Sequence, residues 1–349
     1  MLKDRENHEI TISDHAHNEH IKVVGKSGCG KTFWMCQYMK EKSVSDTFLV
    51  LDFSGSYTES ELRRNNCDIV KNDTFKLYNL NKMGIEISLD KTNAADLVTD
   101  SLIEILKIQS IFQKKILRQS CKEVFLKQFF SFDVLYKTIE LKTKIEEGNI
   151  RENAIILLNR LDDLKTVVQI RININEKVIK YSNRIIEMAE LPARKSIVIT
   201  QFLIAIFWRI IRMKPITGRT YIVLDEFQKL QIRGTSVEEM LREGRKFGVG
   251  LIMLTQFISP DEADILEQCA TSLFFRPNDR NVMTVAKMLN PTAFNEWFKI
   301  LKNLKRGECV VNGMLKVNRS KTNFCYPILC DVIVPETEQL VDKAMVYLE

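Results

Sequence analysis

The stretch GKSGCGKT, residues 25–32, follows the short apolar run IKVV at residues 21–24. It fits the pattern G-x-x-x-x-G-K-[ST], a loop that holds phosphate groups when it joins a strand to a helix. Residues 33–42 have a helical pattern, so both flanks are present. This loop restricts the fold more than any other feature, because it works only where a buried strand of a parallel sheet leads into a helix.

Each position of the loop has a physical task. Glycines let the backbone fold around an anion so that successive N–H groups point inward, and the helix that follows directs its positive end at the same anion. Lys31 is expected to neutralise the β- and γ-phosphates, and the Thr32 hydroxyl to bind Mg²⁺. ATP and Mg²⁺ are therefore the predicted ligands. The predicted nucleotide-binding residues are Gly25, Lys26, Ser27, Gly28, Cys29, Gly30, Lys31 and Thr32.

An acidic pair ends the segment YIVLDEF, residues 221–227. Four apolar residues place Asp225 at the carboxyl end of a buried strand, where parallel sheets have their ligand sites. Asp225 is predicted to hold Mg²⁺, and Glu226 to position and polarise the attacking water. A strand that ends in two acids is common, so the pattern has weight only together with the phosphate-binding loop. The two together favour a nucleotide hydrolase.

The segment LREGRKFGVGLIMLTQ, residues 241–256, contains the next apolar strand after the acidic pair, at residues 249–255. Parallel strands end at the same edge of a sheet, so Gln256 is expected near the γ-phosphate or the attacking water. There it would report whether the phosphate is present. The alternative is a polar residue that simply leaves a strand.

Cationic residues precede this strand. A guanidinium group stabilises the charge that builds on the γ-phosphoryl oxygens, and Arg245 is the first candidate for it, ahead of Arg242. The predicted target is the nucleotide of a neighbouring subunit. Arg276, at the end of the run LFFR, is a competing candidate. The alternative for Arg242 and Arg245 is a solvated helix end, where cations are favourable.

Short apolar strands alternate with helical patterns along the chain. This alternation predicts an α/β fold with a mostly parallel sheet covered by helices on both faces. Strands are expected at residues 21–24, 47–52, 75–77, 85–89, 184–188, 221–224, 249–255, 273–276 and 309–312, and helices at 33–42, 193–213 and 235–247. A helical pattern over residues 94–170 predicts an inserted helical subdomain. We therefore divide the chain into residues 1–92 (the N-terminal part of the ATPase core), 93–183 (the insertion) and 184–349 (the C-terminal part of the core).

Composition limits the function only weakly. The net charge of +6 is compatible with a polyanionic partner without identifying one. The eight cysteines show no CxxC pair and no zinc spacing, which is typical of reduced cytosolic thiols. Residues 197–211 are too few to span a bilayer, so we expect a buried helix, no membrane association and a cytoplasmic location. His8, His15, His17 and His20 lie in a polar opening segment, which favours a solvated arm over a metal site.

Five stretches in a fixed order resemble the HerA–FtsK superfamily of ring-forming, DNA-pumping ATPases, and its HerA-like branch most closely. They are VVGKSGCGKT, FLVLDFSGSY, YIVLDEFQKL, LREGRKFGVGLIMLTQFISP and CATSLFFRPND, and the resemblance covers about residues 18–60 and 184–315. It implies a P-loop NTPase fold of the RecA/ASCE-like type. HerA-like proteins typically carry a small β-barrel before the loop, whereas 24 residues precede Gly25 here. The chain is therefore expected to be a motor domain or to need a partner.

The resemblance implies a hexameric, helicase-like ATPase that translocates on double-stranded DNA through non-specific contacts, working with a nuclease or another effector in DNA processing or defence. Two alternatives stay open. One is a conjugation or genome-packaging ATPase of the same superfamily, and the other is an ATP-gated regulatory or scaffold protein that moves no polymer. Two basic loops could contact DNA, although such loops are more often only solvated. Their residues are Lys302, Lys305 and Arg306 in one loop and Gln231 and Arg233 in the other.

Overall fold

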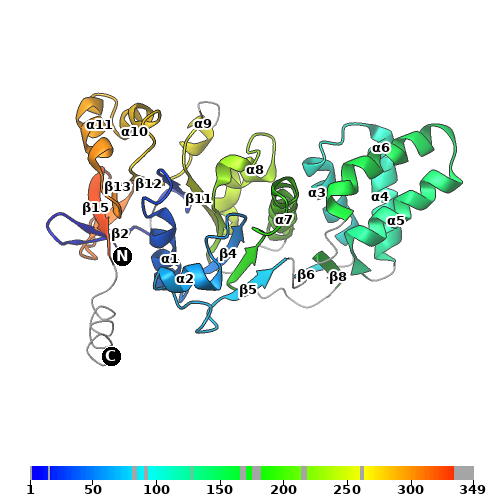
Figure 1. Ribbon diagram of the computed structural model, residues 1–349, viewed down its shortest axis with the longest axis horizontal. Helices are drawn as coiled ribbons and strands as arrows, with labels where there is room; N and C mark the ends of the chain where they lie inside the picture. Colours follow the sequence, from blue (N-terminus) through cyan, green and yellow to red (C-terminus); the bar gives the residue numbers. More distant parts are fainter. Residues whose placement is uncertain are drawn as a thin grey trace.

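The computed structural model describes residues 2–14, 16–80, 85–89, 93–126, 129–165, 170–174, 182–213, 218–259 and 263–333. Within these residues, a sheet of twelve strands crosses the molecule (Figure 1). Seven neighbouring strands run parallel in the order β12-β3-β11-β10-β4-β9-β5, which confirms the predicted α/β fold with a mostly parallel sheet. These strands are β3 (Ile21–Val24), β4 (Thr47–Asp52), β5 (Lys76–Asn79), β9 (Arg184–Glu187), β10 (Thr220–Leu224), β11 (Val249–Thr255) and β12 (Thr271–Phe275).

The strand order brings the segments with chemical motifs together. β11 lies between β3 and β10, with Thr255 opposite Val24 and Met253 opposite Leu224. Because the three strands are parallel, the phosphate-binding loop, the acidic pair and Gln256 follow them at one edge of the sheet. The sequence predicted this shared edge, but it did not predict that β11 separates the other two strands.

Five antiparallel strands extend the sheet beyond β12, and two of them come from the N-terminus. The expectation of a solvated N-terminal arm is wrong: β1 pairs with β15, and His20 is buried, with its Nδ1 accepting the Leu251 N–H at 3.0 Å. His15 lies outside the described residues. A local pattern did not predict β1 and β2, which pair with each other and also with β15 and β14, about 300 residues away in sequence. The five strands are β1 (Leu2–Asp4), β2 (Glu9–Ile12), β13 (Glu308–Asn312), β14 (Leu315–Val317) and β15 (Ile328–Val332).

Alternation along the strands creates two layers of buried side chains, one on each face of the sheet. On β10, Tyr221 and Val223 join one layer, while Ile222 and Leu224 join the other. Helices α1 and α2 cover the first layer, and α7 and α8 cover the second. The phosphate-binding loop therefore leads into a helix that is itself packed on the sheet. The four helices are α1 (Lys31–Lys42), α2 (Glu59–Arg64), α7 (Ala193–Met213) and α8 (Ser236–Glu243).

The predicted helical insertion appears as four helices at one end of the molecule (Figure 1). It meets the core at α7, against which both α3 and α6 pack. A small second sheet joins β6, β8 and β7, so β6, N-terminal to residue 93, pairs with a strand inside the insertion. The division at residues 92 and 183 stays a prediction. These elements are α3 (Ala94–Ile105), α4 (Ile111–Phe125), α5 (Phe132–Ile145), α6 (Gly148–Lys165), β6 (Ile85–Leu89), β7 (Phe129–Phe130) and β8 (Ile170–Ile174).

Helix α7 is, within the described part of the chain, the one helix long and apolar enough to cross a membrane by length and composition. However, 61% of its most apolar window is buried inside the protein, and Phe202 and Trp208 belong to the core. A buried core helix accounts for this pattern. The remaining helices are α9 (Ala263–Leu266), α10 (Val282–Leu289), α11 (Phe294–Asn303) and the 3₁₀ turns η1 (Phe227–Lys229) and η2 (Gly244–Phe247).

Candidate active site at the carboxyl edge of the sheet

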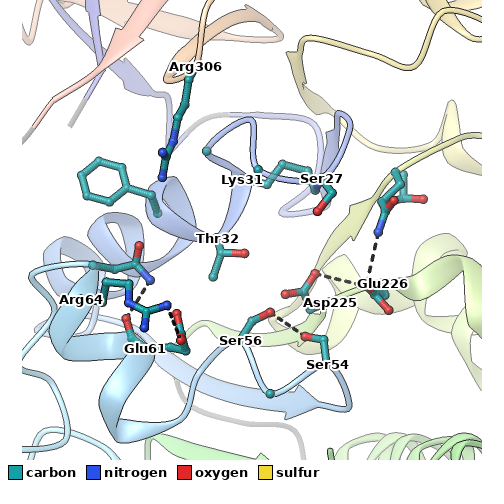
Figure 2. Close-up of a pocket in the computed structure, with 17 residues that line it drawn as sticks. Ser27, Lys31, Thr32, Ser54, Ser56, Glu61, Arg64, Asp225, Glu226 and Arg306 are labelled. Atoms are coloured by element: carbon teal, nitrogen blue, oxygen red, sulfur yellow. Dashed lines mark hydrogen bonds and ion pairs between the residues drawn. The ribbon is translucent and has the colours of Figure 1, made fainter.

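A cavity of about 480 Å³ opens at the carboxyl edge of the sheet (Figure 2). Its walls come from the loops after β3, β4, β10 and β11, from helices α1 and α2, and from the turn before β13. Lys31, Thr32, Asp225, Glu226 and Gln256 all line it, so the fold gathers these predicted residues around one space. The other lining residues are Ser27, Gly28, Gly30, Phe33, Ser54, Gly55, Ser56, Glu61, Arg64, Asn65, Thr255 and Arg306.

The phosphate-binding loop has the backbone that an anion site needs. Gly28 and Gly30 have φ angles of 73° and 113°, in the left-handed region where other residues are strained. Gly30 is the N-cap of α1, so the positive end of this helix faces the cavity. The buried Lys31 ammonium donates hydrogen bonds to the carbonyl oxygens of Gly25 at 2.7 Å and Lys26 at 3.1 Å. A lysine held against the loop in this way is placed to meet phosphate oxygens.

Three of the eight predicted loop residues support the loop and do not line the cavity. The Gly25 N–H donates to the Thr255 carbonyl oxygen at 3.1 Å, and the Lys26 N–H donates to the Arg276 carbonyl oxygen at 2.9 Å. Cys29 is buried, and burial raises the pKa of its thiol. Gly25 and Lys26 thus tie the loop to the ends of β11 and β12.

Asp225 provides an oxygen suited to a metal ion. Its side chain is buried, and Oδ1 accepts the Glu226 backbone N–H at 2.9 Å. Oδ2 is also buried and has no hydrogen-bond partner among the described residues, which is costly unless a cation or a donor meets it. The Thr32 hydroxyl belongs to the same cavity, so the two residues would hold Mg²⁺ through oxygen ligands. Bound there, Mg²⁺ would neutralise phosphate charge.

Burial raises the pKa of Asp225 to about 7; the Asp52 carboxylate adds to this effect, and Lys31 opposes it. A carboxyl group whose pKa is higher in the folded than in the unfolded protein binds more protons when folded. Its contribution to stability therefore falls as the pH rises from about 4 to about 7. With a chelator present, we expect Asp225→Asn to raise the Tm by about 2–5 °C near pH 8 and to have little effect near pH 4. Thermal unfolding of both proteins between pH 4 and pH 8 measures this effect. A Tm difference that does not change with pH would contradict the prediction.

Glu226 and Gln256 meet at one end of the cavity. The Gln256 Nε2 donates to Glu226 Oε1 at 3.2 Å, and the other oxygen of Glu226 pairs with Lys229. Glu226 has a φ of 53°, a conformation uncommon for residues with a side chain and frequent at functional sites. The Asn278 side-chain amide donates to the Gln256 carbonyl oxygen at 3.1 Å and holds the turn after β11. A carboxylate and an amide in contact form a suitable pair for holding a water molecule.

The loop after β4 forms a further wall of the cavity, and none of the predicted site residues lies in it. Asp52 is fully buried, and its carboxylate accepts the backbone N–H groups of residues 54–57 and the Ser54 hydroxyl at 2.9–3.2 Å. Burial raises the pKa of Asp52, while these hydrogen bonds lower it. They fix Ser54 and Ser56 with their hydroxyl oxygens 2.7 Å apart. The signal was available, because residues 47–52 are an apolar strand that ends in Asp, as β10 leads to Asp225.

The arginines predicted to act on a nucleotide do not line this cavity. Arg242 and Arg245 precede β11 and so lie at the opposite edge of the sheet, about 20 Å away by the length of a seven-residue strand. Arg245 is exposed, and Arg242 pairs with Glu238 at 2.7 Å. Arg276 contributes its backbone oxygen to the loop. Arg245 cannot reach the site of its own chain, so its predicted role requires a neighbouring copy.

The basic loops considered for DNA lie in two different places. Arg306 lines the cavity, and Lys302 and Lys305 are exposed nearby in sequence. Arg233 is exposed and pairs with Asp264 at 2.8 Å. A DNA-binding role for these side chains stays a prediction, and the position of Arg306 points to the cavity.

Comparison with known proteins places these features in a family. Residues 2–206 match the family described as "Helicase HerA, central domain". A curated relative, the probable helicase MJ1565 of Methanocaldococcus jannaschii, is 22% identical over 341 residues, which cover 89% of this chain and 63% of the relative. The chain thus spans less than two thirds of that relative's length.

Solved structures share the fold over most of the chain. VirB4 of Thermoanaerobacter pseudethanolicus superposes with a TM-score of 0.67 at 16% identity, covering 97% of this chain and 96% of that one. The bacterial conjugative coupling protein TrwBdeltaN70 gives a TM-score of 0.64 at 13% identity, covering 92% and 86%. At such identities the likeness shows the fold alone, and that fold is the P-loop ATPase fold predicted from the sequence.

Proposed function

The chain belongs to the family of the helicase HerA central domain, and from this premise we propose that it is the motor of an ATP-driven translocase on double-stranded DNA. Its place among P-loop ATPases of the HerA–FtsK type follows from the family and the fold. The proposed parts are movement along duplex DNA, a ring of six copies, the use of Mg²⁺, and work in the cytoplasm with a nuclease or another effector.

One observation carries the proposal. A single cavity contains the buried lysine and the helix N-terminus for phosphates, the unpaired Asp225 oxygen for a cation, and the Glu226–Gln256 pair. A protein that only bound a nucleotide would not need a carboxylate beside an amide at the end of the cavity. The arrangement therefore supports hydrolysis in addition to binding.

The residues divide the work as follows. Lys31 and the N-terminus of α1 hold and neutralise the phosphates. Glu226 orients the attacking water and withdraws its proton, while Gln256 contacts both Glu226 and the terminal phosphate. Gln256 directly follows β11, and the turn η2, which contains Arg245, precedes it. Loss of the phosphate next to Gln256 would thus shift β11 and change the position of Arg245 at its other end.

The ring is proposed because Arg245 is exposed at the edge of the sheet opposite to the cavity. From there it would enter the site of a neighbouring copy and stabilise charge on the phosphoryl group. Electron microscopy with ATP and duplex DNA tests this arrangement, and six-fold rings around DNA are the expected result. Particles of one or two copies under these conditions would contradict it.

Translocation predicts that DNA stimulates ATP hydrolysis. We expect the hydrolysis rate to rise when duplex DNA is added at low salt, and the effect to shrink as salt increases, because phosphate contacts release counterions. The measurement is a phosphate-release assay with and without duplex DNA, with Lys31→Ala as the background control. Hydrolysis that no DNA stimulates would contradict a translocase; assembly with ATP but without DNA binding would favour the scaffold alternative. Stimulation alone would not separate this role from conjugation or genome packaging.

A further inference from the structure

The cavity extends well beyond the end where hydrolysis is proposed. Figure 2 shows Asp225 and Glu226 on one side, Arg306 and Arg64 on the other, and Thr32 between them. Phosphates bound at the N-terminus of α1, with the last one at Glu226, would fill only the first side. A cavity of about 480 Å³ has the size of a site for a complete small ligand, so the second side must receive the rest of the molecule.

The turn that carries Arg306 is fixed directly to the phosphate-binding loop. The Gly307 N–H donates to the Cys29 carbonyl oxygen at 3.0 Å, and the Gly307 carbonyl oxygen accepts the Val332 N–H at 2.9 Å. Before it, the Lys305 N–H donates to the Glu308 carboxylate at 2.7 Å. The backbone at Arg306 is therefore held in place, and its position is coupled to the loop.

The Arg306 side chain is available for a ligand. It is exposed at the rim of the cavity, and among the described residues it has no ion-pair or hydrogen-bond partner. Its planar guanidinium can stack on an aromatic ring, which a lysine ammonium cannot do in the same way. Phe33, the residue after Thr32, also lines the cavity and adds apolar surface.

The wall opposite Arg306 comes from α2 and is also tied to α1. Glu61 accepts a hydrogen bond from Arg64 at 2.8 Å through Oε1, and its other oxygen stays available as an acceptor. Gln37 of α1 donates to the Asn65 carbonyl oxygen at 3.0 Å, which holds the end of α2 against the helix of the phosphate-binding loop. The Glu61 carboxylate, a hydrogen-bond acceptor, therefore lies on the wall that faces the Arg306 guanidinium.

We propose that this second side is the base-and-ribose subsite of the nucleotide, with Arg306 stacked on the base and Glu61 accepting from the ribose hydroxyls. The proposal rests on the proposed function, since it takes the terminal phosphate to lie at Glu226. Arg306 then acts on the nucleotide of its own chain, whereas Arg245 would act on that of a neighbour. The nucleoside part is recognised by a residue 274 positions after Thr32 in the sequence.

Calorimetric titration with two ligands tests the subsite. ATP carries a base and ribose, whereas inorganic tripolyphosphate offers the phosphates alone. We expect Arg306→Ala to weaken ATP binding about tenfold and to leave tripolyphosphate binding unchanged, because only the stacking contact is lost. Arg306→Lys should be as weak as Arg306→Ala for ATP. Lys305→Ala, in the same turn but outside the cavity lining, is the matched control and should bind ATP normally.

The outcomes separate the subsite from the function on which it rests. Equal losses for ATP and tripolyphosphate in Arg306→Ala would place Arg306 on the phosphates and overturn the subsite, as would unchanged ATP binding or full rescue by lysine. In each of these cases the unchanged protein still binds ATP, and the proposed function stands. If the unchanged protein bound neither ligand, both proposals would fail. Thermal unfolding of each variant confirms that the fold is intact.

Discussion

Exchanging Glu226 for glutamine is expected to lower the rate of ATP hydrolysis by about 100-fold or more and to leave the affinity for ATP nearly unchanged. Glutamine has almost the shape of glutamate but cannot accept a proton from water. The residue lines the cavity beside Gln256, and its backbone lies in the left-handed region, so its position is determined by the fold. Single-turnover hydrolysis and equilibrium binding of a fluorescent ATP analogue measure the two effects separately.

A matched control is Glu243→Gln, which makes the same chemical change at the end of α8, outside the cavity lining. It should hydrolyse ATP like the unchanged protein. Full turnover in Glu226→Gln would show that another group positions the water, and the assignment of Glu226 would be wrong. A loss of both ATP binding and hydrolysis would instead show that the substitution disturbs the segment after β10, for instance because the ion pair with Lys229 is lost.

Replacing Lys31 with alanine is expected to abolish measurable ATP binding, a loss of about 100-fold or more in affinity. Lys31 is the buried cation of the cavity, and its ammonium would make charge-assisted hydrogen bonds to phosphate oxygens, which are about twice as strong as neutral ones. Calorimetric titration with ATP measures this loss. Because the Lys31 ammonium also bonds to the Gly25 and Lys26 carbonyl oxygens, the Tm should fall slightly.

Lys26→Ala is the control for Lys31→Ala, because it removes a lysine from the same loop. Lys26 does not line the cavity, and its structural contact is through its backbone N–H, which alanine keeps. Its affinity for ATP should stay within about threefold of the unchanged value, since Lys26 is partly exposed outside the cavity lining and solvent screens its charge. ATP binding of normal strength in Lys31→Ala would remove the basis for a phosphate site in this loop.

Much of the core could be predicted from the sequence, because its strands are short, apolar and joined to motifs. Residues 249–255 were predicted as a strand and form β11 with the same bounds, and residues 193–213 likewise form α7. The helix predicted over residues 235–247 divides into α8 and the 3₁₀ turn η2. At this point the chain packs closely on the start of β11, since a Cβ at Gly244 would lie 2.7 Å from the Val249 carbonyl oxygen.

Site residues could be predicted where they directly follow a strand that the sequence reveals. They could not be predicted where the site forms between segments that are far apart in the chain. Asp225 follows its strand directly, so a local pattern was enough. Arg306 could not be assigned in this way, because its turn meets the phosphate-binding loop through contacts between segments far apart in the chain, such as the Gly307–Cys29 hydrogen bond. In the sequence it looks like any basic residue in a solvated turn. The N-terminal strands were not predicted for the same reason, since β1 pairs with the distant strand β15.

The strand order has a consequence for how this protein is made. β3, which holds the phosphate-binding loop, is complete once the ribosome has added residue 24, yet both of its neighbours, β11 and β12, are synthesised more than 200 residues later. Until then β3 has neither partner, and long-range pairings of this kind form slowly. Nucleotide binding should therefore be among the last properties that the nascent chain acquires. An incomplete chain should accordingly not hydrolyse ATP.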